Sequence, residues 1–104
     1  MTTATLHIEH PISDLATWTA AFCRFADHRR QAGVLAERIL QPDDDPAYIV
    51  VDLDFANADA ARSFRTFLEQ RVWVDPTSSP ALRGTPTARV LVETSGRLAD
   101  VARS

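Results

Sequence analysis

The residues best suited to chemistry gather near the start of the chain, in the segment TLHIEH at residues 5–10. His7 and Glu9 alternate there with apolar residues, as in a strand with one apolar and one ionisable face. Histidine is the side chain whose ordinary pKa lies nearest neutrality, so His7 is a candidate general acid or base. Asp52 or Glu9 would orient its imidazole. The alternative is a hydrogen-bonded histidine in a polar seam between sheets.

Two further side chains complete the predicted site. Arg89 is suited to bind a carboxylate or to stabilise a developing oxyanion. The alternative for Arg89 is an ion pair with Glu9 or Glu93 on neighbouring strands. Tyr48 is suited to position a ring or donate a hydrogen bond, although a half-buried tyrosine is also common at interfaces. The catalytic residues are predicted to be His7, Asp52 and Arg89, with ligand contacts from Glu9 and Tyr48.

No metal site and no cofactor are predicted. His7 and His10 are an odd number of residues apart, so a strand points them to opposite faces, and no third ligand joins His7 and Glu9. The acidic run at 43–45 lacks the glycine and distal glutamate of a calcium loop, which favours a solvated turn. No glycine-rich phosphate loop is present among the three glycines.

Three other reactive side chains are given structural roles. Cys23, the single cysteine, lies at the margin of an apolar helical stripe with no base beside it, so it is predicted to pack rather than react. His10 and His28 lie at the ends of elements and are predicted to be on the surface.

Length and composition narrow the class of protein. A chain of 104 residues is one domain by size, and a net charge of −3 argues against binding nucleic acid through its phosphates. One cysteine excludes an internal disulfide. The longest apolar run, AYIVV at 47–51, is too short to cross a membrane, and the N-terminus has no signal-peptide pattern. A cytoplasmic location is expected.

Hydrophobic periodicity predicts six elements in the order βαββαβ. A helix is predicted to begin at an N-cap on Ser13 and to end before Gly33, and Asn57 is predicted to cap the second helix. The connection at 74–86 is rich in proline and hydroxyl residues. The expected strands are 4–10, 34–41, 47–55 and 87–93, the expected helices are 14–31 and 58–71, and the expected units are a domain at 1–94 and a tail at 95–104. The segments 74–86 and 95–104 are predicted to be mobile or to wrap around a partner.

This order predicts a ferredoxin-like α+β fold, in which the first and third strands are central and both helices cover one face of an antiparallel sheet. Parity assigns two sets of apolar residues to the face under the helices: Ala47, Ile49, Val51, Leu53 and Phe55 in 47–55, and Ala88, Val90 and Val92 in 87–93. The parity of 34–41 is ambiguous. The opposite face is predicted to carry His7, Glu9, Tyr48, Val50, Asp52, Arg89, Leu91 and Glu93. This mixed face is expected to be covered by a second copy of the chain.

Several stretches resemble a known family. They are HRRQAGVLAERIL at 28–40, the DDP turn at 44–46, ADAARSFRTFL at 58–68, and SPALRGTPTARVLVE at 79–93. Together, over about residues 5–94, they resemble the dimeric α+β barrel superfamily and, within it, the antibiotic biosynthesis monooxygenase-like domains. The resemblance implies two subunits packed sheet to sheet, with a ligand cavity within the barrel or between sheet and helices.

The family includes cofactor-independent oxygenases of polycyclic phenols and haem-degrading enzymes, whose sites typically use an asparagine on the first strand, a tryptophan, and a histidine after the second helix. Here Trp73 alone matches in rough place, and it joins the predicted ligand-binding residues. Two functions are therefore expected: a small cofactor-independent monooxygenase-like protein acting on an aromatic or polyketide-like molecule, or a non-catalytic ligand-binding or structural homodimer.

Overall fold

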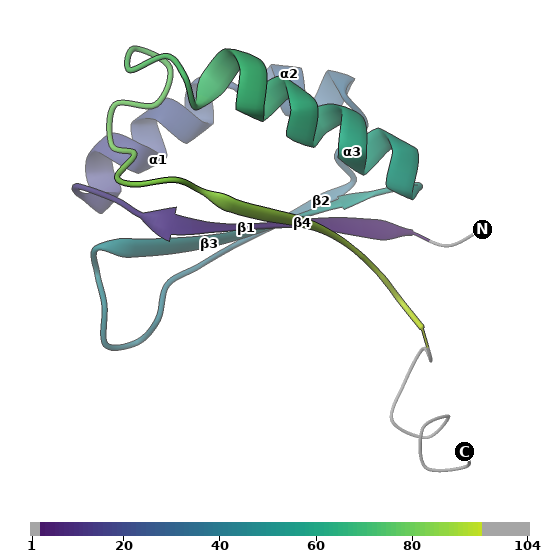
Figure 1. Ribbon diagram of the computed structural model, residues 1–104, viewed down its shortest axis with the longest axis horizontal. Helices are drawn as coiled ribbons and strands as arrows, with labels where there is room; N and C mark the ends of the chain where they lie inside the picture. Colours follow the sequence, from purple (N-terminus) through teal and green to yellow (C-terminus); the bar gives the residue numbers. More distant parts are fainter. Residues whose placement is uncertain (1–2, 95–104) are drawn as a thin grey trace.

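The computed structural model describes residues 3–94, which form a twisted four-stranded antiparallel sheet with all helices on one face (Figure 1). The predicted tail at 95–104 lies outside the described residues. The elements are β1 (Ala4–Pro11), α1 (Leu15–Arg24), α2 (Ala26–Gln31), β2 (Ala36–Leu40), β3 (Tyr48–Phe55), α3 (Ala58–Phe67), the π-helical turn η1 (Leu68–Val72) and β4 (Thr87–Val92). Within residues 3–94, no helix is long and apolar enough to cross a membrane.

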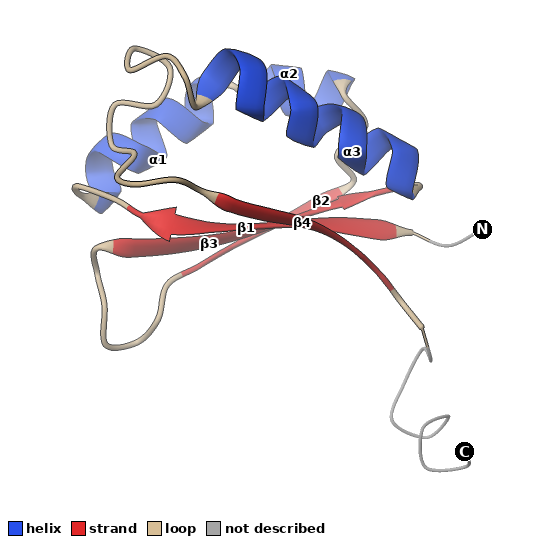
Figure 2. Ribbon diagram, viewed as in Figure 1, coloured by secondary structure: helices blue, strands red, loops and turns tan. Residues whose placement is uncertain are grey.

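The strand order is β2-β3-β1-β4, which confirms the predicted ferredoxin-like topology with the first and third strands central. Figure 2 shows the two layers, with the helices above the sheet and the other face of the sheet left without helical cover. We call that second face the helix-free face. The register across the sheet places Arg38 opposite Asp52, Asp52 opposite His7, and His7 opposite Arg89.

The core lies between the sheet and the helices, as the alternation in the central strands predicts. Ile49, Val51, Leu53 and Phe55 of β3 are all buried, and every second residue of β1 packs beside them. Burial of each large apolar side chain stabilises the fold by about 1.5–3 kcal/mol relative to exposure. Val92 lies on the predicted face of the sheet, opposite Ala4, but it does not enter the core. It is 51% exposed, because it ends the edge strand β4 and has neighbouring strand on one side only.

The first helix differs from its prediction at both its start and its middle. Its N-cap is Asp14 rather than Ser13, since the Asp14 carboxylate accepts a hydrogen bond of 2.7 Å from the backbone N–H of Thr17. The single helix predicted over 14–31 is interrupted at Phe25, which separates α1 from α2. Cys23, predicted to pack at the margin of the stripe, is exposed near the end of α1.

The other two caps are as predicted. Gly33 follows α2 with φ of +98°, and its N–H and that of Val34 donate to the carbonyls of Arg30 and Arg29, both at 3.1 Å. This is the paired arrangement in which a glycine ends a helix. Asn57 caps α3 by accepting a 2.8 Å hydrogen bond from the backbone N–H of Ala60.

The connection at 74–86 is attached to the rest of the fold at its centre. Ala81 is buried, and its carbonyl accepts a 2.9 Å hydrogen bond from the backbone N–H of Ser13. The backbone N–H of Arg83 donates to the carbonyl of Pro11 at 3.1 Å. These bonds hold the connection over one end of the helix–sheet layer. The proposed mobility or partner-wrapping of this segment stays a prediction.

Candidate functional sites on the two sides of the sheet

The sheet divides the predicted site residues between its two sides. His7, Glu9, Tyr48, Asp52 and Arg89 belong to the helix-free face, as their parity predicts. Trp73 instead packs against the core under the helices. The described residues therefore offer two candidate sites, a polar cluster on one face of the sheet and a cavity on the other.

The polar cluster is centred on His7. Its Nδ1 lies 2.6 Å from Oδ1 of Asp52, and its Nε2 lies 2.8 Å from Oε2 of Glu9. The Tyr48 hydroxyl donates to the other oxygen of Glu9 at 2.7 Å. The antiparallel register produces this cluster, because His7 and Asp52 are directly opposed on β1 and β3.

Both nitrogens of His7 contact groups that only accept when ionised, so both contacts are hydrogen bonds when the ring carries two protons, as an imidazolium. The hydrogen bonds to Glu9 and then Asp52 raise the pKa of His7 above its ordinary value, against partial burial. The hydrogen bonds from His7 and Tyr48 lower the pKa of Glu9, and the bond to Glu9 raises the pKa of Tyr48.

These contacts favour the polar-seam interpretation of His7, because neither nitrogen is free to take a proton from a substrate. Arg89 faces His7 from β4, yet it forms no ion pair with Glu9 or Glu93 within residues 3–94. Its charge contributes to lowering the pKa of Glu9. The catalytic roles of His7, Asp52 and Arg89 stay predictions.

The register of β2 adds a residue that sequence reasoning missed. Arg38 is placed on the helix-free face, where it donates two hydrogen bonds of 3.0 Å to the carboxylate of Asp54. This guanidinium lowers the pKa of Asp54, whose Oδ1 also accepts a 2.7 Å hydrogen bond from Thr5. The parity of β2 is ambiguous, so the sequence could not assign Arg38 to a face of the sheet. Only the pairing of β2 with β3 decides which way its side chain points.

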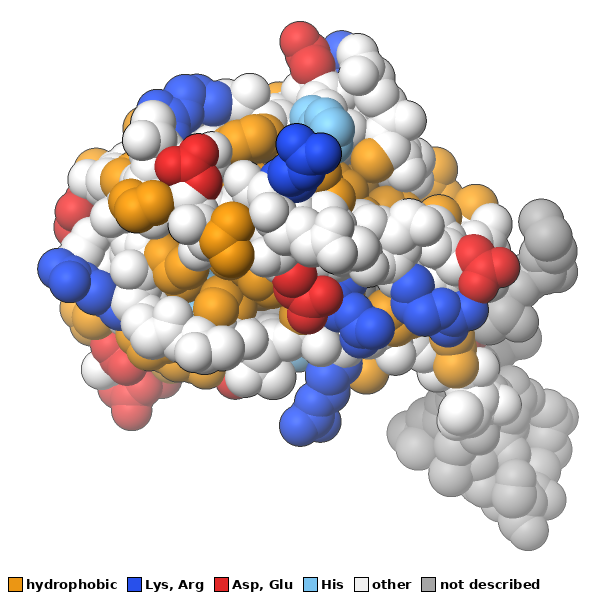
Figure 3. Space-filling view, turned by 45° about the horizontal axis from the view of Figure 1, so that its top comes forward, with side chains coloured by type: hydrophobic (Ala, Val, Ile, Leu, Met, Phe, Trp, Pro, Cys, Tyr) orange, Lys and Arg blue, Asp and Glu red, His pale blue; other side chains and the backbone are white. Residues whose placement is uncertain are grey.

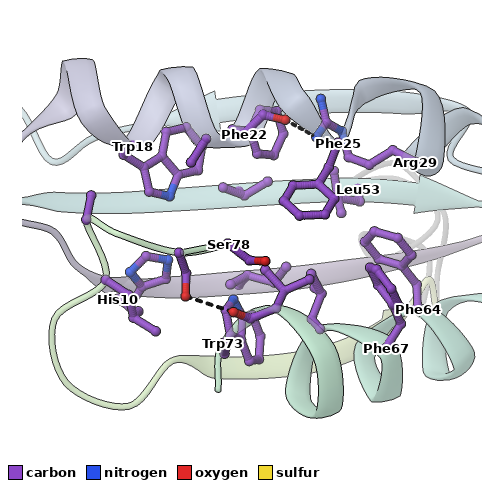
Figure 4. Close-up of a pocket in the computed structure, with 18 residues that line it drawn as sticks. His10, Trp18, Phe22, Phe25, Arg29, Leu53, Phe64, Phe67, Trp73 and Ser78 are labelled. Atoms are coloured by element: carbon purple, nitrogen blue, oxygen red, sulfur yellow. Dashed lines mark hydrogen bonds between the residues drawn. The ribbon is translucent and has the colours of Figure 1, made fainter. Parts of the chain in front are cut away.

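The second site is a cavity of about 80 Å³ between the helices and the sheet, which we call the helix–sheet cavity. It is partly open to solvent, and Figure 3 shows hydrophobic side chains in a hollow on this side of the molecule. Figure 4 shows aromatic rings converging on it from α1, α3 and the segment after α3. Its aromatic walls are Trp18, Phe22, Phe25, Phe64, Phe67 and Trp73.

His10 lies at one end of the helix–sheet cavity (Figure 4), so the prediction that it is a surface residue is wrong. It is only 4% exposed. The alternation along the strand could have predicted this burial, because His10 shares the face of Leu6 and Ile8, which were assigned to the core. Its Nδ1 lies 2.9 Å from the carbonyl of Pro11, and burial lowers its pKa.

Arg29, also missed from sequence, lines the same cavity and is 5% exposed. Its guanidinium lies over the Phe22 ring at 3.5 Å from the centroid and donates a 2.5 Å hydrogen bond to the carbonyl of Phe22. Its Nε pairs with the carboxylate of Glu37 on β2. The cluster links α1, α2 and β2. The sequence gave no reason to expect a buried Arg29, because its position near the end of the predicted helix did not indicate burial.

Residues 3–94 contain no group of three or more histidine, cysteine or acidic side chains arranged to hold a metal ion. No protein-family model and no curated protein sequence matches this chain.

Solved structures, by contrast, match it over nearly its whole length. SnoaB, a cofactor-independent oxygenase from Streptomyces nogalater, superposes with a TM-score of 0.61 at 20% identity, over 93% of this chain and 96% of that one. The monooxygenase ActVA-Orf6 of Streptomyces coelicolor, solved with nanaomycin D, gives 0.63 at 18% identity, over 93% and 92%.

A dimeric ferredoxin-like protein from an uncultured marine organism gives 0.60 at 8% identity, over 89% and 96% of the two chains. Other matching structures carry a provisional description as antibiotic biosynthesis monooxygenases. At these identities the likeness is one of fold. The chain has the ferredoxin-like fold of antibiotic biosynthesis monooxygenase-like proteins, which confirms the resemblance predicted from the sequence.

Proposed function

We propose that this chain is a small, cofactor-independent monooxygenase-like protein that forms a homodimer and binds an aromatic or polyketide-like molecule in the helix–sheet cavity. The aromatic lining of that cavity is the observation that carries the proposal. Small-molecule sites are concave and mostly apolar, with a few polar groups that fix orientation. A lining of six aromatic side chains, with His10 at one end, fits that description.

The size of the cavity restricts its ligand. Its volume of about 80 Å³ is roughly half that of an engineered apolar cavity that holds benzene, which is about 150 Å³. A ring therefore enters with movement of the lining side chains, or with part of the ligand left in the open mouth. One ring, or one end of a polycyclic molecule, is the expected occupant. The nanaomycin D bound by ActVA-Orf6 supports a ligand of this class.

The helix-free face supports the homodimer. Leu40 and Leu91 are about half exposed there, and the oppositely charged Arg38 and Asp52 are paired across β2 and β3. Within residues 3–94 no helix covers this face. A two-fold related copy would cover the apolar side chains and set opposite charges against one another. The dimeric state of the marine ferredoxin-like protein agrees with this arrangement.

A non-catalytic ligand-binding or structural homodimer is the second candidate. It is favoured by the contacts of His7, whose two nitrogens are both taken by carboxylates. In this alternative the polar cluster only fixes how the two sheets meet.

Ligand binding is tested with a cavity-filling substitution and its matched control. Ala21 lies on α1, is buried and lines the cavity, whereas Ala20 beside it is exposed. Ala21→Leu is expected to abolish the thermal stabilisation that small aromatic compounds give the wild type, and Ala20→Leu is expected to retain it. Equal stabilisation of both variants would place binding outside the cavity.

The homodimer is tested at two neighbouring positions of β2 that face opposite ways. Leu40 lies on the helix-free face and Ile39 on the other, and their exposures are similar at 50% and 45%. Sedimentation equilibrium is expected to give twice the chain mass for the wild type and for Ile39→Glu. Leu40→Glu is expected to shift the equilibrium to monomer. A wild-type mass of one chain at micromolar concentration would refute the dimer.

A further inference from the structure

The lining of the helix–sheet cavity includes His10, a polar side chain that has one nitrogen without a hydrogen bond within residues 3–94. His10 and Arg29 are the two titratable residues in its lining. Arg29 is engaged by Glu37, by the carbonyl of Phe22 and by the Phe22 ring. The Ser79 hydroxyl donates to the carbonyl of Val72 at 2.8 Å. Nε2 of His10 makes no hydrogen bond within residues 3–94.

The contact of the other nitrogen determines the tautomer of His10. A backbone carbonyl only accepts, so the 2.9 Å contact with Pro11 requires the proton to be on Nδ1. Burial disfavours the charged ring and lowers its pKa, so the imidazole is neutral near pH 7. Nε2 then carries a lone pair and accepts hydrogen bonds at the end of an aromatic cavity.

We infer that His10 recognises the hydroxyl group of an aromatic or enolic ligand in the helix–sheet cavity and serves as the base that takes its proton. The inference rests on the proposed ligand site and names the chemistry that the site selects. In the transfer the ligand O–H bond breaks and an N–H bond forms at Nε2, which leaves a phenolate or enolate beside an imidazolium. The two charges form a pair, and the Pro11 carbonyl continues to accept from Nδ1. No oxidant or reductant is needed for this step.

The cavity therefore distinguishes a phenol from its methyl ether. A phenol donates to Nε2, whereas the ether presents no donor and, by filling the cavity, buries the acceptor unpaired, which costs about 1–3 kcal/mol. That difference corresponds to an affinity ratio of at least about fivefold, since 1.4 kcal/mol is a factor of ten.

The test uses 4-nitrophenol and 4-nitroanisole as probes, with their dissociation constants measured by NMR titration. The wild type is expected to bind the phenol at least about fivefold more tightly than the ether. In His10→Asn the amide nitrogen replaces Nδ1 as donor to Pro11, while the acceptor at Nε2 is removed. The preference is then expected to fall to about onefold, with the affinity for the ether little changed.

Proton transfer is measured separately through the visible absorption of 4-nitrophenolate. In the wild type the bound phenol is expected to ionise at lower pH than the free phenol. His10→Gln restores an accepting oxygen at the end of the side chain but no base, so its bound phenol is expected to stay protonated to higher pH than in the wild type. Ionisation at the same pH in the wild type and in His10→Gln would overturn the role of base.

A measurement on the wild type alone keeps the inference falsifiable if a variant does not fold. The ¹⁵N resonances of His10 are expected to show an unprotonated Nε2 in the free protein and a protonated one with 4-nitrophenol bound. A proton on Nε2 in the free protein would refute the inference. Equal preference for the phenol in the wild type and His10→Asn would also refute it, while the ligand site would stand. Failure of both probes to bind would overturn the ligand site as well.

Discussion

Replacing Arg29 by methionine is expected to destabilise the fold far more than the same change at Arg30, its neighbour on α2. Arg29 is buried, while the Arg30 side chain is 72% exposed and pairs with Asp27 within the same helix. Methionine retains much of the aliphatic length of arginine and removes the charge. The two substitutions therefore differ in what the guanidinium contacts.

The size of the expected loss in stability follows from three contacts of Arg29. A hydrogen bond from a charged donor to the carbonyl of Phe22 contributes about 1.5–3 kcal/mol. The cation–π contact with the Phe22 ring adds about 0.5–2 kcal/mol. The ion pair with Glu37 adds about 0.2–1 kcal/mol, because the Glu37 side chain is 35% exposed and its charge is screened by solvent. Since the contacts share one side chain and are not additive, a loss of about 2–4 kcal/mol is expected.

Urea denaturation at one protein concentration measures the difference. Arg29→Met is expected to lower the free energy of unfolding by about 2–4 kcal/mol, and Arg30→Met by no more than about 0.5 kcal/mol, as for an exposed helical ion pair. Glu37→Gln is expected to fall between them, because it leaves the other two contacts of Arg29 in place. Losses within about 0.5 kcal/mol of each other for Arg29→Met and Arg30→Met would refute the proposed linkage of α1, α2 and β2.

Two further predictions concern His7 and the start of α1. Because the folded protein raises the pKa of His7, the stability that its charge contributes is full below the ordinary value of about 6.5 and is lost as the pH rises through the folded pKa. The lowered pKa of Glu9 keeps its share present above its ordinary value of 4.5. The stability gap between wild type and His7→Gln is therefore expected to be larger at about pH 5.5 than at about pH 9, and a gap that grows with pH would contradict the charged ring. At the helix start, Asp14→Ala is expected to cost about 1 kcal/mol in urea denaturation, whereas Ser13→Ala should change stability by less than about 0.5 kcal/mol; the reverse order would restore Ser13 as the cap.

The faces of the central strands were predictable from the sequence because side-chain direction alternates along any strand. His7, Glu9 and Asp52 therefore lie on one face as predicted, and Ile49, Val51, Leu53 and Phe55 supply the core from the other. The capping roles of Gly33 and Asn57 were equally predictable, since each residue acts on backbone groups within four residues of itself. The βαββαβ order follows from such local signals, and the fold follows from the order.

The location of the cavity and its polar lining were decided only by the tertiary structure. His10 had the parity of the core, but its burial depends on the chain around Ala81 closing over the end of β1. Arg29 is buried where its guanidinium reaches the carbonyl of Phe22 on α1 and the carboxylate of Glu37 on β2. The face of Arg38 was settled by the pairing of β2 with β3. Each of these depends on contacts between segments distant in the sequence, whose register and packing no local pattern encodes.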